Sequence, residues 1–176
     1  MEQVILVNEQ DEVVGTMEKI EAHQKAALHR AFSVFIFNDQ GEMLLQQRAL
    51  NKYHSPGLWT NSCCSHPRPG EDTAGAASRR LEEEMGFTTA LQEIFSFTYR
   101  ADFDNGLTEH ELDHVLVGYY DGTVQPNKQE VSGHTWWPMQ HIEESMAQEP
   151  EKFTVWFRIA FPKIRDWQAA HPVEAS

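Results

Sequence analysis

The sequence has few cysteines, few basic residues and no long apolar run, and each shortage excludes a class of protein. Its two cysteines, Cys63 and Cys64, are adjacent, and neighbouring cysteines have poor geometry for a structural disulfide. A chain without a disulfide framework suits a reducing compartment, so we expect a cytoplasmic protein. The apolar run at residues 4–7 is too short for a signal peptide, and no run reaches transmembrane length.

The shortage of basic residues also limits the partners. The chain has 27 acidic and 14 basic residues, which gives a net charge of −13. Nucleic acids and anionic membrane surfaces are bound by clustered Lys and Arg, so we expect neither as a partner. If the substrate is an anion, local cations or a metal ion must offset the acidic field.

The pattern of apolar residues predicts one domain, residues 1–176, with an α+β fold. Residues 31–37 form the densest apolar run, and its aromatic and β-branched content favours a buried strand. Strands that arrive mostly as hairpins, with a helix between them, indicate a mixed or antiparallel sheet flanked by helices. The expected strands are 4–7, 13–18, 29–37, 42–48, 59–65, 94–103, 109–120 and 131–137. The expected helices are 71–85, 138–148 and 150–169, and residues 19–26 are expected to form a short helix or a loop.

The stretch 60–67 places a thiol and an imidazole two residues apart. In an extended segment alternate side chains share a face, so Cys64 and His66 point one way and Cys63 points the other. One face would then carry a nucleophile or acid/base beside a metal ligand. The alternative is a buried free cysteine and a histidine that caps the turn at Pro67.

Further imidazoles and carboxylates extend this candidate site. Glu109 and Glu111 share a face of an expected strand, although such a pair is more often solvated surface. His23 and His29 flank a core strand, where a single histidine is more often structural. Together with His66 they would form an N/O site that suits Mn²⁺, Zn²⁺ or Mg²⁺ rather than a thiolate zinc site.

The helix expected at 71–85 carries two pairs of opposite charge. Its first turn is predicted to contain acidic residues, which the helix dipole favours, and Gly86 is a good terminating residue. Arg79 and Glu83, like Arg80 and Glu84, are four residues apart and share a face. They could be no more than surface ion pairs, which contribute little.

The same helix resembles the Nudix signature. The resemblance rests on Glu71, Arg79 and the run Leu-Glu-Glu-Glu-Met-Gly-Phe at 81–87. Two positions depart from it, because Ser65 stands where the signature begins with Gly and Arg80 where its first catalytic Glu would be. In hydrolases of that superfamily this Glu helps to bind the metal that activates water, so its loss speaks against diphosphate hydrolysis.

Over nearly its whole length the chain more closely resembles the type I isopentenyl diphosphate isomerases, with a Nudix-like core at about 28–162. The resemblance rests on Thr-Asn-Ser at 60–62 with Cys64, His66 and Pro67, and on Tyr-Arg-Ala at 99–101, Glu-x-Glu at 109–111 and Trp156. It implies a flavin-independent 1,3-allylic proton shift between isopentenyl and dimethylallyl diphosphate, in isoprenoid biosynthesis, by a monomer or weak dimer. The alternatives are a Nudix diphosphate hydrolase and a catalytically silent metal-binding or interaction module.

The resemblance also implies a role for each matching residue. The catalytic residues would be Cys64, Glu111 and Tyr99. The ligands of a divalent metal (Mn²⁺, Mg²⁺ or Zn²⁺) would be His23, His29, His66, Glu109 and Glu111. Glu84 would hold a second Mg²⁺ that arrives with the diphosphate. The substrate-binding residues would be Lys19, Arg48, Lys52, Arg80 and Trp156.

Two departures from the family pattern and one expectation about reactivity complete the prediction. The spacing from His23 to His29 is one residue shorter than in the family, and Cys63 stands where an apolar residue is common. As a nucleophile or acid/base beside an imidazole, Cys64 is expected to have a lowered pKa.

Overall fold

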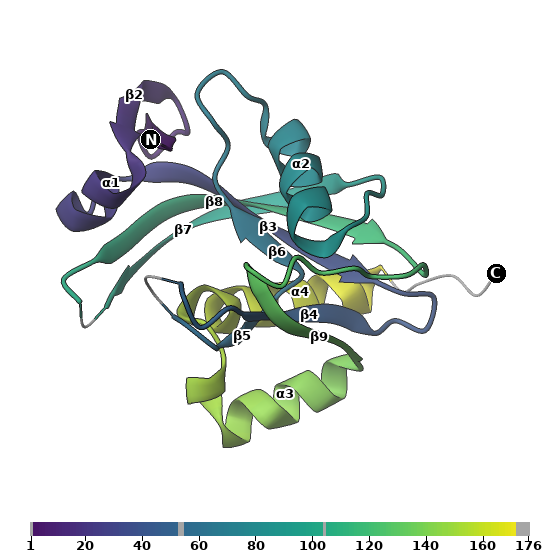
Figure 1. Cartoon of the computed structure of the whole chain (residues 1–176). Coiled ribbons are helices and arrows are strands. Elements are labelled where there is room, and N and C mark those ends of the chain that lie inside the picture. The colour runs from purple at the N-terminus through teal and green to yellow at the C-terminus, as the bar shows by residue number, and fades with distance from the viewer. Residues whose placement is uncertain (1, 53–54, 104, 172–176) are drawn as a thin grey trace.

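The computed structural model describes residues 2–52, 55–103 and 105–171. Its strands form one mixed sheet (Figure 1). The centre of the sheet is β3 (His29–Phe37), which pairs in parallel with β8 (Thr108–Tyr119) along its whole length. β7 (Gln92–Asp102) pairs with the far side of β8. On the other side of β3 lie β1 (Gln3–Val7) and its hairpin partner β2 (Val13–Glu18).

The remaining strands extend the sheet from the edge of β3 that faces away from β8. The short β6 (Cys63–Ser65) pairs with residues Phe32 to Val34 of β3. β4 (Met43–Arg48) follows β3 through a hairpin and pairs with β5 (Trp59–Thr60) and β9 (Val131–Trp137). β6 and β8 therefore lie on opposite sides of β3, and this arrangement positions the candidate site.

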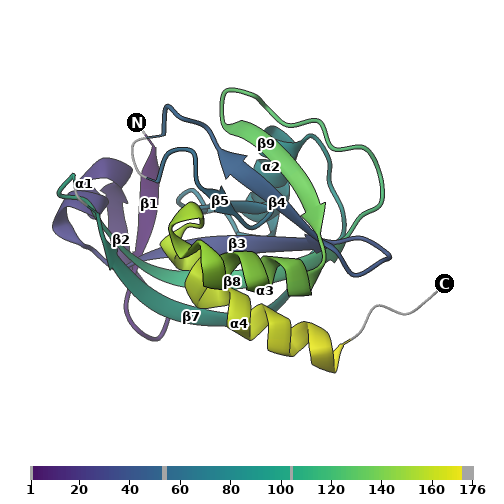
Figure 2. The same ribbon diagram turned by 90° about the horizontal axis from the view of Figure 1, so that it is seen from below.

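Helices cover both faces of the sheet. α2 (Thr73–Met85) packs on one face, whereas α3 (Met139–Gln148) and α4 (Val155–Ala170) pack on the other (Figures 1 and 2). The short α1 (Lys19–Lys25) follows β2 and contacts β8 at one end of the sheet. Buried apolar side chains fill the space on each side, so the sheet is the middle layer of three.

Local chemistry explains where α2 begins and ends. The Asp72 carboxylate accepts a hydrogen bond from the Gly75 backbone N–H, as an N-cap does. Gly86 ends the helix with φ = 77°, and a Cβ there would lie 2.5 Å from the backbone oxygen of Gln125. Only glycine satisfies both conditions. The acidic residues thus precede the helix rather than lie in its first turn, which corrects the expectation.

The predicted fold class is confirmed, whereas the predicted start of the last helix is wrong. A separate 3₁₀ turn, η1, occupies Pro150–Lys152, and α4 begins only at Val155. Thr154 separates η1 from α4, because its N–H donates to the Trp59 carbonyl and its hydroxyl caps the start of α4. No helix in the described ranges is long and apolar enough to cross a membrane. The domain boundaries 1–176 and 28–162 stay predictions.

Candidate active site

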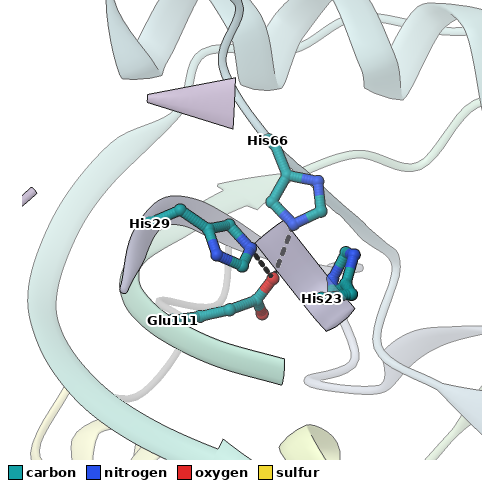
Figure 3. Close-up of side chains that lie close together, drawn as sticks. All are labelled: His23, His29, His66 and Glu111. Carbon is teal, nitrogen blue, oxygen red and sulfur yellow. Dashed lines mark hydrogen bonds and ion pairs between the residues drawn. The ribbon is translucent and has the colours of Figure 1, made fainter. Parts of the chain in front are cut away.

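Three histidines and Glu111 converge at one end of the sheet (Figure 3). His29 begins β3 and lies directly beside Glu111 in the parallel register with β8. His66 follows β6, and His23 reaches the group from α1. One ligand atom from each residue lies within 4.8 Å of the others. Four segments, α1, the start of β3, the residue after β6 and β8, therefore build one cluster.

The cluster has the chemistry of a divalent metal site. Glu111 Oε2 lies 3.0 Å from His29 Nε2 and 2.5 Å from His66 Nε2. Nδ1 of His23 and Nδ1 of His29 bond to the Lys19 and Ala27 carbonyls, which orients each ring. Such second bonds hold metal-ligating imidazoles in position. Three imidazoles and a carboxylate, almost fully buried, fit a divalent cation.

The charges within the cluster shift the pKa values of its members. Burial raises the pKa of Glu111, but His66 and His29 outweigh burial and hold it well below its ordinary value. Burial lowers the pKa of His29, and the Glu111 contact overcomes this and raises it overall. For His66 burial prevails, and its pKa is lowered. The cluster thus keeps an ionised carboxylate in a buried place.

Tyr99 joins this cluster to Glu109. β7 places Tyr99 opposite Glu111, and its hydroxyl contacts Glu111 Oε1 and also Glu109 Oε2 at 2.5 Å. Both carboxylates share a face of β8, as the alternation predicted, and both are buried rather than solvated. Glu109 lies outside the group of four whose ligand atoms approach within 4.8 Å, so it adjoins the cluster through Tyr99. Burial and then the charges of Glu109 and Glu111 raise the pKa of Tyr99, which keeps its proton.

Cys64 lies across β3 from these carboxylates. Its thiol donates to Asn61 Oδ1 at 2.8 Å, and its sulfur accepts the Trp156 Nε1–H at 2.9 Å. Burial and the Asp113 charge raise the pKa of this thiol, so the predicted low pKa of Cys64 is wrong. The predicted facing is confirmed. Cys64 and His66 line one cavity, while Cys63 packs towards α2 and donates to Glu84 Oε2 at 2.8 Å.

The predicted cations line the same cavity. Arg80 Nη2 lies 3.1 Å from Glu84 Oε1 and 2.7 Å from Glu130 Oε1. The Arg48 guanidinium lies 5.3 Å from the centre of the Trp156 ring. All but two of the predicted site residues line this cavity. Those in the lining are Lys19, Arg48, Lys52, Cys64, His66, Arg80, Glu84, Tyr99, Glu109, Glu111 and Trp156. The exceptions, His23 and His29, belong to the histidine cluster, whose other members His66 and Glu111 line the cavity.

The inner cavity adjoins a larger one. Lys19, Lys52, Ser65 and Arg80 line both the inner cavity and an outer cavity of about 600 Å³. Three cations, Lys19, Lys52 and Arg80, therefore line both cavities. Arg48 lines the inner cavity alone, together with Cys64, Trp156 and Tyr99.

Four residues of the site were given no role by the sequence. Asn61 is fully buried, and its Nδ2 donates to the carbonyls of Val34 and Cys63, which leaves Oδ1 for the Cys64 thiol. Ser33 donates to Asp113 Oδ2 at 2.7 Å and lies 3.8 Å from the Cys64 sulfur. Asp113 follows Glu109 and Glu111 on the same strand face, so alternation could have found it. No local signal marks Ser33 or Glu130.

Comparison with known proteins places this site in a known fold family. The NUDIX domain matches residues 27–157. The crystal structure of a Deinococcus radiodurans protein aligns with a TM-score of 0.69 and 23% identity, over 84% of this chain and 90% of that one. A MutT protein from Methanosarcina mazei Go1 aligns with a TM-score of 0.65 and 20% identity, over 80% and 95%. The chain is a NUDIX-domain protein.

Relatives with higher sequence identity assign the chain to one family within the NUDIX proteins. The isopentenyl-diphosphate Delta-isomerase of Pectobacterium atrosepticum is 54% identical over 95% of this chain and 94% of its own length. The proteins of the same name from Serratia proteamaculans and Burkholderia multivorans are 53% and 50% identical, over 89% and 94% of this chain and 87% and 97% of their own. Within the NUDIX proteins, the chain belongs to the isopentenyl-diphosphate Delta-isomerase family.

Proposed function

We propose that the protein interconverts isopentenyl diphosphate and dimethylallyl diphosphate by moving one proton onto, and another off, the allylic carbon skeleton. One observation carries the proposal. A thiol and a carboxylate reach one cavity from strands on opposite sides of β3, and four cations line the same cavity. The family assignment supports the same reaction.

The reaction needs an acid and a base placed apart. Protonation of the terminal CH₂ of the alkene gives a tertiary carbocation at C3, and removal of a proton from C2 gives the product. Cys64, which holds its proton, and Glu111, which is ionised and touches the Tyr99 hydroxyl, supply such a pair. We assign the proton transfers to Cys64 and to the Glu111–Tyr99 pair.

The walls of the cavity protect the cationic intermediate. The Trp156 indole is anchored by its N–H bond to Cys64, so its ring lies beside one of the two groups that would transfer the protons. An aromatic face stabilises a desolvated cation by roughly 2 kcal/mol or more. Trp156 and Tyr99 are both almost fully buried, which helps to exclude the water that would capture the carbocation.

Two divalent cations complete the proposal. His23, His29, His66 and Glu111, with Glu109 beside them, would hold the first, which we propose to be Mn²⁺, Mg²⁺ or Zn²⁺. When bound, it would fix and polarise the Glu111 carboxylate. Glu84 would hold a Mg²⁺ that enters with the diphosphate, and Lys19, Arg48, Lys52 and Arg80 would bind the phosphate oxygens. The reaction requires no flavin.

An assay with the purified protein tests the proposal. Isopentenyl diphosphate is followed in D₂O by NMR, and we expect dimethylallyl diphosphate to form with deuterium at exchanged positions. A chelator should abolish this conversion, and the Cys64→Ser variant should nearly abolish it. Release of phosphate without isomerisation would instead indicate a hydrolase. A protein that converts neither would be a silent binding module.

A further inference from the structure

Glu130 stands among the cations of the proposed diphosphate site. Its Oε1 lies 2.7 Å from Arg80 Nη2 and 3.6 Å from Lys52 Nζ. Glu84 Oε1 lies 3.1 Å from the same nitrogen of Arg80. The Glu130 side chain is 25% exposed and lines the outer cavity. A carboxylate therefore occupies the place where a phosphate oxygen would otherwise meet Arg80 and Lys52.

The backbone around Glu130 holds it at this position. The Asn127 N–H donates to the Glu84 carbonyl at 2.8 Å, and the Glu130 N–H donates to the Asn127 carbonyl at 2.9 Å. The Ala49 N–H donates to the Glu130 carbonyl at 3.1 Å, just beyond the end of β4. Glu130 is thus fixed to the two elements that carry Glu84 and Arg48, and its place beside Arg80 is part of the fold.

This placement has a consequence for anion binding. A diphosphate without a metal would have to displace Glu130 from Arg80 and would then face the charges of both Glu130 and Glu84. Unit charges about 5 Å apart at an effective dielectric of about 20 interact by more than the free energy of a tenfold change in affinity. A diphosphate that carries Mg²⁺ brings the positive charge that both carboxylates need.

We propose that Glu130 is a specificity-determining residue, which makes the site bind the magnesium complex of the diphosphate in preference to the free diphosphate. This inference rests on the proposed function, because it takes Arg80, Lys52 and Glu84 as the diphosphate and Mg²⁺ ligands. Glu130 pairs with Arg80 and Lys52 while the substrate is absent. On binding it would yield these cations to the phosphate, and its charge would favour a diphosphate that carries Mg²⁺.

The test measures binding rather than turnover. Isothermal titration calorimetry gives the Kd of inorganic diphosphate for the metal-loaded protein, with Mg²⁺ in excess and with none added. The quantity of interest is the ratio of the Kd without Mg²⁺ to the Kd with Mg²⁺. Glu130→Gln should lower this ratio at least tenfold, because the free anion no longer competes with the Glu130 carboxylate for Arg80 and Lys52, and the magnesium complex loses a carboxylate.

Glu83→Gln is the matched control. It removes the same charge from a neighbour of the same arginine, since Glu83 Oε1 lies 3.2 Å from Arg80 Nη1. Glu83 is more exposed, at 42%, and lines neither cavity. In Glu83→Gln the ratio of the Kd without Mg²⁺ to the Kd with Mg²⁺ should stay within twofold of the wild-type ratio. Glu130→Asp keeps the charge and should retain most of the ratio, which also covers the case in which the Gln variant folds poorly.

The outcomes separate the inference from the proposed function. A wild-type protein that binds no diphosphate with or without Mg²⁺ would refute the proposed diphosphate site. A wild-type protein that prefers the magnesium complex, with the same preference in Glu130→Gln, would overturn only the role of Glu130. A thermal melt accompanies each variant, and a lower Tm with an unchanged ratio would assign Glu130 a structural role alone and overturn the inference.

Discussion

Replacing Arg80 by alanine should destabilise the protein by about 2–3.5 kcal/mol at pH 7, which is well above the value for a surface ion pair. Arg80 lies between Glu83, Glu84 and Glu130, and its side chain is 17% exposed. Glu84 is the partner that matters most, because its side chain is only 6% exposed. Without Arg80 a buried carboxylate keeps only the Cys63 thiol and the nearby Lys52 charge.

Protonation sets an upper limit on this loss. Burial already raises the pKa of Glu84 above its ordinary value of 4.5, although Arg80 opposes the rise. In the variant Glu84 can accept a proton, and holding that proton at pH 7 costs about 3.5 kcal/mol relative to the unfolded chain. At pH 5 the same limit is about 0.7 kcal/mol.

The sign of the pH dependence follows from the same linkage. A carboxyl whose folded pKa lies above its unfolded pKa binds more protons in the folded state, so stability falls as the pH rises through that window. The stability difference between wild type and Arg80→Ala should therefore be large at pH 7 and shrink towards pH 5. For a protein of this size each kcal/mol lowers Tm by about 2–4 °C.

Urea unfolding at pH 5 and pH 7 measures the difference, with Arg79→Ala as the control. Arg79 pairs with Glu71 and Glu83, whose side chains are 24% and 42% exposed. Its loss should cost about 1 kcal/mol or less at either pH. The double variant Arg80→Ala, Glu84→Gln should recover most of the stability. Equal losses in both arginine variants, or a pH-independent loss in Arg80→Ala, would refute the reasoning.

Four further predictions concern the inner cavity and the histidine cluster. Cys64→Ser should lower kcat by about 10²–10⁴-fold, whereas Cys63→Ala should lower Tm with little change in kcat; similar kcat losses would contradict the facing of the two thiols. Because burial raises the pKa of both thiols, iodoacetamide at pH 8 should label neither before unfolding. Asn61→Ala should lower kcat more than it changes KM, because it frees the Cys64 thiol but touches no cation, and a change confined to KM would argue against this. The metal content of the protein, measured by elemental analysis, should decrease at pH values below about 6, because the imidazoles become protonated. Full metal occupancy in His29→Ala would exclude the cluster as the metal site.

Local periodicity allowed much of the fold and several pairs of site residues to be predicted. The apolar run at 31–37 lies in β3, because an aromatic and β-branched segment between turn residues is best buried in a sheet. The two-residue repeat of a strand placed Cys64 with His66 and Glu109 with Glu111. The helical repeat placed Arg80 beside Glu84. Each of these relations spans only a few residues, so it follows once the type of element is known.

Only the tertiary structure decided how these pairs meet. The parallel register of β3 and β8 brings His29 beside Glu111, which lies 82 residues further along the chain. The raised pKa of Cys64, opposite to the prediction, comes from burial and from Asp113, and no sequence window reports what packs around a thiol. Glu130 meets Arg80 because backbone hydrogen bonds tie its loop to α2. Desolvation and long-range register depend on every element packed around a site, and for that physical reason the sequence alone could not specify them.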